Sequence, residues 1–191
     1  MIGLASVLRK LDRTRAARAG VERVYPQLSA HTLFLRDEYR QNFDAITRQC
    51  GLAQKPSVYV HAPARLEASM APPGHDTLVA IVPVGHLDPH AGQDWEAMTR
   101  RARAAVLERL ATLGVTDLDA HLKFELRFEP ADWQRRFNLV RGATHGLAHT
   151  LLQMGYFRPH NRHARYRNLY FAGASTHPGT GGVRSALSGR V

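Results

Sequence analysis

The chain has 191 residues, of which 44% are hydrophobic and 22% charged, and a formal net charge of +10. This length allows one domain or two small ones, and the composition is that of a globular protein rather than a disordered one. No run of about 18 apolar residues and no secretory signal is visible, so the sequence predicts no membrane-spanning helix. The single cysteine, Cys50, excludes an internal disulfide and a cysteine-based zinc site.

The positive charge is carried almost entirely by arginine, because the only lysines are Lys10, Lys55 and Lys123. A strongly basic chain points to nucleic acid or to an anionic membrane surface as a partner. However, the arginines are scattered and form no block of five or six like charges. An arginine-rich composition without a dedicated basic partner therefore remains the alternative interpretation.

Local patterns predict a mixed α/β (α+β) protein. Residues 1–20 form a basic segment, either an amphipathic helix or a terminus without function. Alternating or β-branched runs predict strands at 31–36, 57–61, 77–84, 122–129 and 168–172. Helical spacing and capping signals predict helices at 37–49, 94–113 and 146–154, and a further helix beginning near Pro130. The proline-rich stretch 62–76 is predicted to be a loop.

The most informative segment is Asn168–Gly182, NLYFAGASTHPGTGG, in which a short apolar run passes into small residues and glycines. Glycine permits the close approach of a ligand or of another stretch of backbone. Such a turn after a strand is common in cofactor sites, because its N–H groups reach a phosphate or a ring carbonyl. The spacing is not G-x-G-x-x-G. On the residues alone, a tight structural turn is therefore as good an interpretation as a ligand site.

Other polar residues offer weaker candidates for chemistry. The histidine pairs, His145 with His149 and His86 with His90, lack the H-E-x-x-H pattern, so no metal site is predicted. The loop 157–162 is rich in hydrogen-bond donors and is interpreted as a solvated loop or a ligand-contacting one. Asp132 is a candidate catalytic acid, with a carboxylate in the first turn of a helix as the alternative. The absence of G-x-S-x-G and of a P-loop motif argues against a hydrolase and an NTPase.

Several segments together resemble one family in the same order along the chain. The segments YFRPHNR at 156–162 and NLYFAGASTHPGTG at 168–181 resemble the C-terminal signature of bacterial-type phytoene desaturases, FAD-dependent carotenoid desaturases related to flavin amine oxidases. Upstream segments agree with the same family: VYPQLSAHT at 24–32, SVYVHAPA at 57–64, APPGHDTLVAIVPVGHL at 71–87 and RGATHGLAHTLLQM at 141–154. The resemblance spans about residues 21–181.

The resemblance implies a two-domain flavoprotein fold of which this sequence holds a part. It implies a C-terminal part of the substrate-binding domain at 21–130 and a C-terminal part of the FAD-binding domain at 131–191, without the N-terminal Rossmann βαβ unit. It assigns to the flavin the residues Gly173, Ala174, Thr176, His177, Pro178, Gly179 and Gly181, with Arg158, His160 and Asn161 in an adjacent loop. Gly181-Gly182-Val183 replaces the usual Gly-Val-Pro, which weakens the assignment beyond Gly181.

The resemblance also implies an activity, which is the formation of C=C bonds in a polyene by hydride transfer to FAD. The expected partners are a carotenoid such as phytoene, an anionic membrane surface for a peripheral cytoplasmic protein, and a missing N-terminal half, with no nucleic acid. Because the fingerprint that grips the FAD pyrophosphate is absent from the sequence, this chain alone is expected not to retain FAD. The alternative is a basic nucleic-acid- or membrane-binding module without catalysis.

Overall fold

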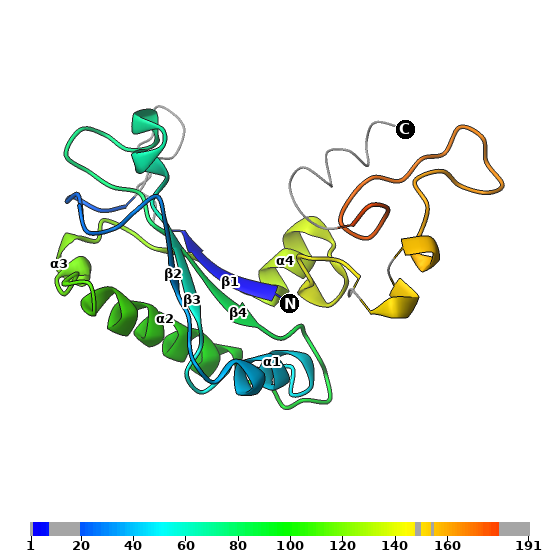
Figure 1. The fold of residues 1–191 in the computed structure, drawn as a ribbon, viewed down its shortest axis with the longest axis horizontal. Helices are drawn as coiled ribbons and strands as arrows, with labels where there is room; N and C mark the ends of the chain where they lie inside the picture. Colours follow the sequence, from blue (N-terminus) through cyan, green and yellow to red (C-terminus); the bar gives the residue numbers. More distant parts are fainter. Residues whose placement is uncertain (1, 8–19, 148–149, 154, 180–191) are drawn as a thin grey trace.

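The computed structural model describes residues 2–7, 20–147, 150–153 and 155–179. Within them, one antiparallel sheet has the strand order β2-β3-β4-β1-β5 (Figure 1). The strands are β1 (Ile2–Val7), β2 (His31–Phe34), β3 (Val58–His61), β4 (Val79–Val84) and β5 (Leu126–Phe128). The α-helices are α1 (Tyr39–Thr47), α2 (Trp95–Ala111), α3 (Leu118–His121) and α4 (Pro130–Phe137). Short 3-10 turns lie at Pro63–Arg65, Ala68–Met70, Val140–Gly142, Leu151–Gln153 and Gly155–Phe157.

The core lies between the sheet and α2. Alternate residues of β4, Ala80, Val82 and Val84, are buried, as the period of two in a strand requires. Apolar residues of α2, among them Ala102 and Leu110, belong to the same buried cluster. Helix α2 begins at Asp94, whose side chain accepts a hydrogen bond from the N–H of Ala97. Each fully buried valine or leucine contributes about 1.5–3 kcal/mol to folding.

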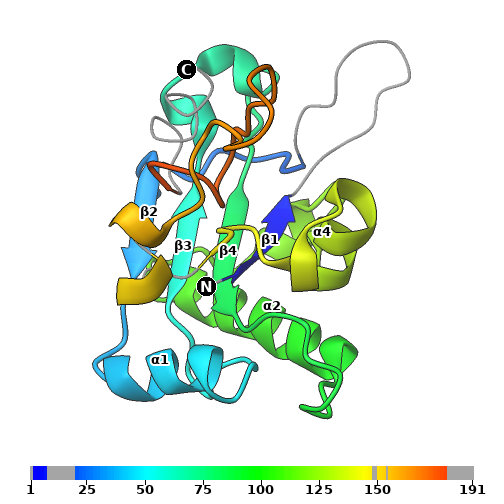
Figure 2. The same ribbon diagram turned by 90° about the vertical axis from the view of Figure 1, so that its right-hand side faces the viewer.

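The opposite face of the sheet, here called the outer face, is less covered. Its residues are exposed or half-buried: His31, Leu33, Tyr59, His61, Val79 and Ile81. The pairing register aligns His31 with His61 and Leu33 with Tyr59 across β2 and β3. Figures 1 and 2 place the C-terminal segment, residues 140–179, on this side of the sheet, while α2 covers the other side. The fold therefore places the outer face and the C-terminal segment opposite each other.

Most of the predicted elements in the middle of the chain are confirmed. Strands β2, β3 and β4 lie within the predicted ranges, and α1, α2 and the start of α4 at Pro130 are present. The mixed α/β class is therefore confirmed. The helical alternative for the N-terminal segment is wrong where the structure describes it, because Ile2–Val7 pair with β4 and β5 as a strand. The remainder of that basic segment, residues 8–19, lies outside the described residues.

Three further predictions are wrong or only partly confirmed, for reasons that depend on tertiary structure. The predicted strand 122–129 is reduced to β5, since α3 precedes it and Leu122 forms only an isolated bridge with Val21. The predicted helix 146–154 is wrong for its described residues, where Gly146 has φ +65° and Leu151–Gln153 form a 3-10 turn. The predicted strand 168–172 is reduced to one bridge between Arg162 and Tyr170, because no described strand lies beside it.

Candidate functional site

The C-terminal segment is organised around a buried arginine. Arg158 is only 2% exposed, and its guanidinium donates hydrogen bonds to three backbone carbonyls. The acceptors are Thr176 at 3.0 Å, Gln153 at 3.1 Å and Ala174. A planar guanidinium suits this task, because its five N–H groups form a fixed fork. Arg158 therefore holds the turn after residue 172 against the 3-10 turn at 151–153.

Asn161 fixes the same turn from a second direction. Its side-chain amide donates to the carbonyls of Phe171 at 3.2 Å and His177 at 2.8 Å. The backbone N–H of His177 in turn donates to the carbonyl of Pro159 at 3.0 Å. The two sequence candidates Arg158 and Asn161 are thus brought together at one turn. Both side chains hydrogen-bond backbone carbonyls in and beside that turn, which gives both residues a positioning role.

The turn itself, residues 173–179, is open at Gly173. Gly173 has φ +139°, and no atom lies within 4 Å of the position that a Cβ would occupy. Thr176 is buried, and both its N–H and its hydroxyl donate to the Gly173 carbonyl. No hydrogen bond among the described residues uses the backbone N–H of Ala174 or Ser175. Such a turn can accept a polar ring edge or a phosphate, and it fits the flavin that the sequence implies.

The remaining predicted flavin residues extend this surface. Gly179 is buried at φ +116°, and the His177–Pro178 peptide bond before it is cis. The rings of His160 and His177 stack with centroids 6.1 Å apart and an interplanar angle of 7°. His160 therefore lies at the edge of the turn, as its place in the adjacent loop predicts. Gly181 lies outside the described residues.

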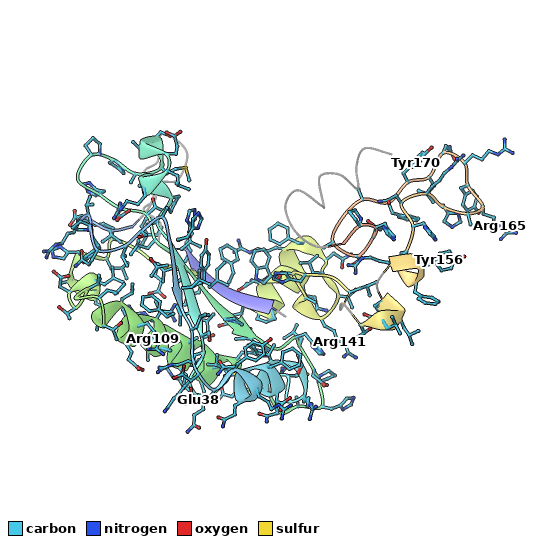
Figure 3. All side chains as sticks on the ribbon, in the orientation of Figure 1. Glu38, Arg109, Arg141, Tyr156, Arg165 and Tyr170 are labelled. Carbon is cyan, nitrogen blue, oxygen red and sulfur yellow. The ribbon has the colours of Figure 1, made fainter. Side chains whose placement is uncertain are left out.

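Between Asn161 and Phe171 the chain forms a narrow hairpin. The N–H of Phe171 donates to the carbonyl of Asn161, and the N–H of His163 donates to that of Leu169. The hairpin carries exposed basic and aromatic side chains: Arg162, Arg165, Tyr166, Arg167 and Tyr170. In Figure 3, Arg165 and Tyr170 lie at the end of the C-terminal segment that is remote from the sheet. We call residues 162–170 the basic hairpin.

Asp132 lies in the first turn of α4 and takes part in capping its N-terminus. Its carboxylate accepts a hydrogen bond from the N–H of Glu129 at 3.1 Å and one from the guanidinium of Arg135. This is the arrangement expected of a first-turn carboxylate, which satisfies a free N–H at the helix N-terminus. A catalytic role for Asp132 stays a prediction.

Local sequence did not reveal that the outer face of the sheet carries an aromatic ladder. The rings of His31 and His61 stack at 4.6 Å, and Nδ1 of His31 lies 2.6 Å from the hydroxyl of Tyr59. The alternation in SVYVH did predict that Tyr59 and His61 share one face of a strand. That this face lies opposite the Gly173 turn depends on the path of the chain between residues 61 and 173 (Figure 2).

A known protein family matches the part of the chain that holds this arrangement. Residues 51–190 match the family model described as flavin containing amine oxidoreductase, and this range includes the turn, Arg158 and Asn161. The chain belongs to the flavin-containing amine oxidoreductases.

Several relatives within the flavin-containing amine oxidoreductases are similar to this chain over most of its length. A phytoene desaturase of Fusarium fujikuroi is 42% identical over 178 residues, which cover 83% of this chain and 31% of the relative. A zeta-carotene-forming phytoene desaturase of Myxococcus xanthus is 41% identical over 173 residues, covering 90% of this chain and 33% of the relative. A 4,4'-diapophytoene desaturase of Staphylococcus aureus is 37% identical over 161 residues, covering 83% and 32%. The chain thus spans about a third of the length of these relatives.

Proposed function

We propose that this chain is the C-terminal portion of an FAD-dependent carotenoid desaturase of the phytoene desaturase type. The observation that carries the proposal is the open Gly173 turn, held by Arg158 and Asn161 on the side of the sheet where the outer face lies. A flavin at the turn and a polyene along the outer face would share one space. The identity to phytoene and diapophytoene desaturases supports the same substrate class.

Under this proposal the turn binds the flavin through its backbone. Gly173, Ala174, Thr176, His177, Pro178 and Gly179 line the cofactor, together with Gly181 by resemblance. The flavin supplies the acceptor for the hydride removed from the polyene. Thr176 and the buried guanidinium of Arg158 occupy carbonyls of the turn, and the backbone N–H groups of Ala174 and Ser175 are proposed to donate to the cofactor. His160 borders the site through its stacking on His177.

The substrate is proposed to lie on the apolar part of the outer face. Leu33 is 64% exposed, and Tyr59 and Ile81 continue the same face across β3 and β4. A polyene offers no hydrogen bonds, so its binding depends on the removal of apolar surface from water. An exposed leucine beside a half-buried isoleucine and a half-buried tyrosine provides such surface without charged groups.

The two domains are proposed to divide near Pro130, with residues 21–130 in the substrate-binding part and 131–191 in the FAD-binding part. Within the described residues, the β-prone run Asn168–Ala172 has no neighbouring strand, and its side chains Leu169, Tyr170 and Phe171 are exposed. A strand of this composition is expected to be paired and covered. A further segment that carries the dinucleotide fingerprint would supply both the covering and the grip on the FAD pyrophosphate.

The basic hairpin is the proposed contact with a membrane surface, and the protein is proposed to be peripheral and cytoplasmic. Within the described residues, many other arginines form ion pairs with carboxylates: Arg23, Arg36, Arg48, Arg65, Arg100, Arg103, Arg127 and Arg135. Exposed Arg162, Arg165 and Arg167 lie instead beside exposed tyrosines, a combination that suits anionic headgroups. Within the described residues no helix is long and apolar enough to cross a membrane.

Flavin content and carotenoid formation test the proposal together. The 191-residue chain purified alone is expected to show no flavin absorbance, because the proposed fingerprint segment is absent. Co-expression with the N-terminal part of a related phytoene desaturase, in cells that make phytoene, is expected to restore bound flavin and coloured product. Stoichiometric flavin in the isolated chain would contradict the need for the second segment. A flavin-loaded pair that leaves phytoene unchanged would contradict the substrate assignment.

A further inference from the structure

Three potential metal ligands meet in the two loops that follow α1 and β4. Cys50 lies just after α1, and His86 and Asp88 lie just after β4. The backbone joins the two loops, because the N–H of Gly85 donates to the carbonyl of Gly51 at 2.9 Å. Cys50 is buried, whereas His86 and Asp88 are half-buried. One ligand atom from each residue lies within 4.8 Å of the others.

The distances suit one shared ion. The sulfur of Cys50 lies 3.7 Å from Nε2 of His86 and 3.9 Å from Nδ1. With the usual Zn–S and Zn–N bond lengths, a tetrahedral ion holds its sulfur and nitrogen ligands about 3.6 Å apart. Asp88 adds a carboxylate, of which Oδ1 already accepts a hydrogen bond from the N–H of His90. Ligating carboxylates in metal sites are commonly oriented by such outer hydrogen bonds.

A single side chain holds the backbone of all three ligand residues in place. The amide of Gln93 donates to the carbonyls of Cys50 and His86, and its oxygen accepts from the N–H of Asp88 at 2.9 Å. Gly85 permits this close approach, because a Cβ there would lie 2.2 Å from the carbonyl carbon of Cys50. Cys50 itself has φ +50°, an unfavourable value for a residue other than glycine, asparagine or aspartate. The loops are therefore held in one arrangement before any ion binds.

We propose that Cys50, His86 and Asp88 form a binding site for a divalent ion of zinc-like softness, with a fourth position open to water. Thiolate, imidazole and carboxylate are ligands that zinc accepts together, and three protein ligands leave such a position. On binding, the Cys50 thiol releases its proton to solvent as the metal–sulfur bond forms. The single cysteine led the sequence analysis to exclude a cysteine-based zinc site, but a mixed site needs only one thiolate. Its other ligands, His86 and Asp88, come from a second loop that begins about 36 residues later in the chain.

The guanidinium of Arg141, which lies beside His86, disfavours the binding of a metal ion. Nη1 of Arg141 lies 3.2 Å from Nε2 of His86, so the guanidinium occupies the space beside one ligand atom. Arg141 must move when His86 binds a metal, and its charge repels a divalent ion. We therefore expect metal affinity to rise when Arg141 is removed, an outcome that adventitious binding to surface histidines would not produce.

The proposal is tested by titrating the purified 191-residue chain with Co²⁺ and measuring the thiolate-to-cobalt charge-transfer absorbance, followed by displacement with Zn²⁺. Cys50→Ser should abolish the charge-transfer band, and His86→Ala and Asp88→Asn should each weaken binding at least tenfold. Arg141→Ala should tighten binding. The matched control is His90→Ala, which removes an exposed histidine of the same turn and should leave affinity unchanged. Far-UV circular dichroism confirms that each variant is folded.

Two results would overturn the site. Cobalt binding without a charge-transfer band would exclude Cys50 as a ligand. Equal losses in His86→Ala and His90→Ala would indicate non-specific capture by loop histidines. Neither result depends on flavin or carotenoid, so the metal proposal and the desaturase proposal fail independently of each other.

Discussion

Nε of Arg158 donates a hydrogen bond of 3.0 Å to the carbonyl oxygen of Thr176, 18 residues further along the chain. This bond joins the loop that carries a family-like YFRPHNR sequence to the turn that carries THPG. A buried charge is costly unless its hydrogen bonds are satisfied, and here three carbonyls satisfy it. The conformation of the proposed flavin-binding turn therefore depends on this guanidinium, together with the amide of Asn161.

We expect Arg158→Lys to loosen the turn, because an ammonium cannot reproduce the planar fork and leaves carbonyls unpaired. Each lost charge-assisted hydrogen bond costs about 1.5–3 kcal/mol. In the protein assembled with its N-terminal partner segment, flavin content should fall at least tenfold. Flavin absorbance per protein measures this. The control is Arg162→Lys in the exposed hairpin, and equal flavin loss in both variants would contradict a specific role for Arg158.

Substitution of two glycines distinguishes the free-energy cost of backbone strain from the cost of a steric clash. Gly74 and Gly142 both have left-handed φ, +76° and +64°, but only at Gly142 would a Cβ strike the backbone of Pro130, at 2.1 Å from its carbonyl oxygen. Gly74→Ala should cost about 1–2 kcal/mol, whereas Gly142→Ala should cost about 3–5 kcal/mol, since backbone must shift. Urea unfolding measures both. Equal losses would show that the contact between Gly142 and Pro130 is unimportant.

The raised pKa of Tyr25 leads us to expect that the protein loses stability at alkaline pH. Burial, followed by its hydrogen bond to Asp117 at 2.9 Å, raises the pKa of Tyr25 from 10.0 to about 12. Because the folded state favours the neutral phenol, this contribution is complete below pH 10 and disappears as the pH rises to about 12. It amounts to about 3 kcal/mol.

Denaturant midpoints measured from pH 9 to pH 12 test this expectation. Tyr25→Phe should be less stable at pH 9, and its stability should fall less steeply above pH 10. The same hydrogen bond lowers the pKa of Asp117. The stability that ionised Asp117 contributes through this hydrogen bond is therefore lost when the pH falls into the acid range and the carboxylate is protonated. Parallel alkaline slopes for Tyr25→Phe and the unmodified chain would refute the assignment to Tyr25.

Asp132→Asn distinguishes a helix-capping role from a catalytic one. The amide retains an acceptor for the N–H of Glu129 but loses the charge that favours a helix N-terminus and pairs with Arg135. A capping role predicts a stability loss of about 0.5–1 kcal/mol and an unchanged kcat in the assembled enzyme. A kcat reduced a hundredfold or more at normal flavin content would instead identify Asp132 as catalytic.

Leu33 and Leu66 form a matched pair for testing the outer face. Their exposures are nearly equal, 64% and 66%, but Leu33 lies in strand β2 on the outer face, whereas Leu66 follows the 3-10 turn at Pro63–Arg65. Leu33→Glu should raise KM for the polyene about tenfold or more in the assembled enzyme, because a carboxylate replaces apolar contact surface. Leu66→Glu should leave KM unchanged. Similar effects of both substitutions would place the substrate elsewhere.

The amino-acid sequence by itself determined the local elements whose periodicity is strong. Strand β3 alternates in sequence, β4 is a short continuous apolar run, and α2 has both an apolar stripe and an Asp94 cap. The positions of these elements therefore follow from local sequence patterns. The sequence also carried the family resemblance, because the motifs at 156–162 and 168–181 are contiguous. These features require no knowledge of what packs against them.

Only the tertiary structure decided the role of each side chain in the candidate sites. Gly146 packs against Ala174 and Ser175, and this contact replaces the predicted helix with turns. The sequence suggested that Arg158 lies in a ligand-contacting loop. In the structure its guanidinium N–H groups instead donate to backbone carbonyls up to 18 residues away. Cys50 and His86 meet across 36 residues. Hydrogen bonds and ligand sets of this kind depend on distances in space, which local propensity does not encode.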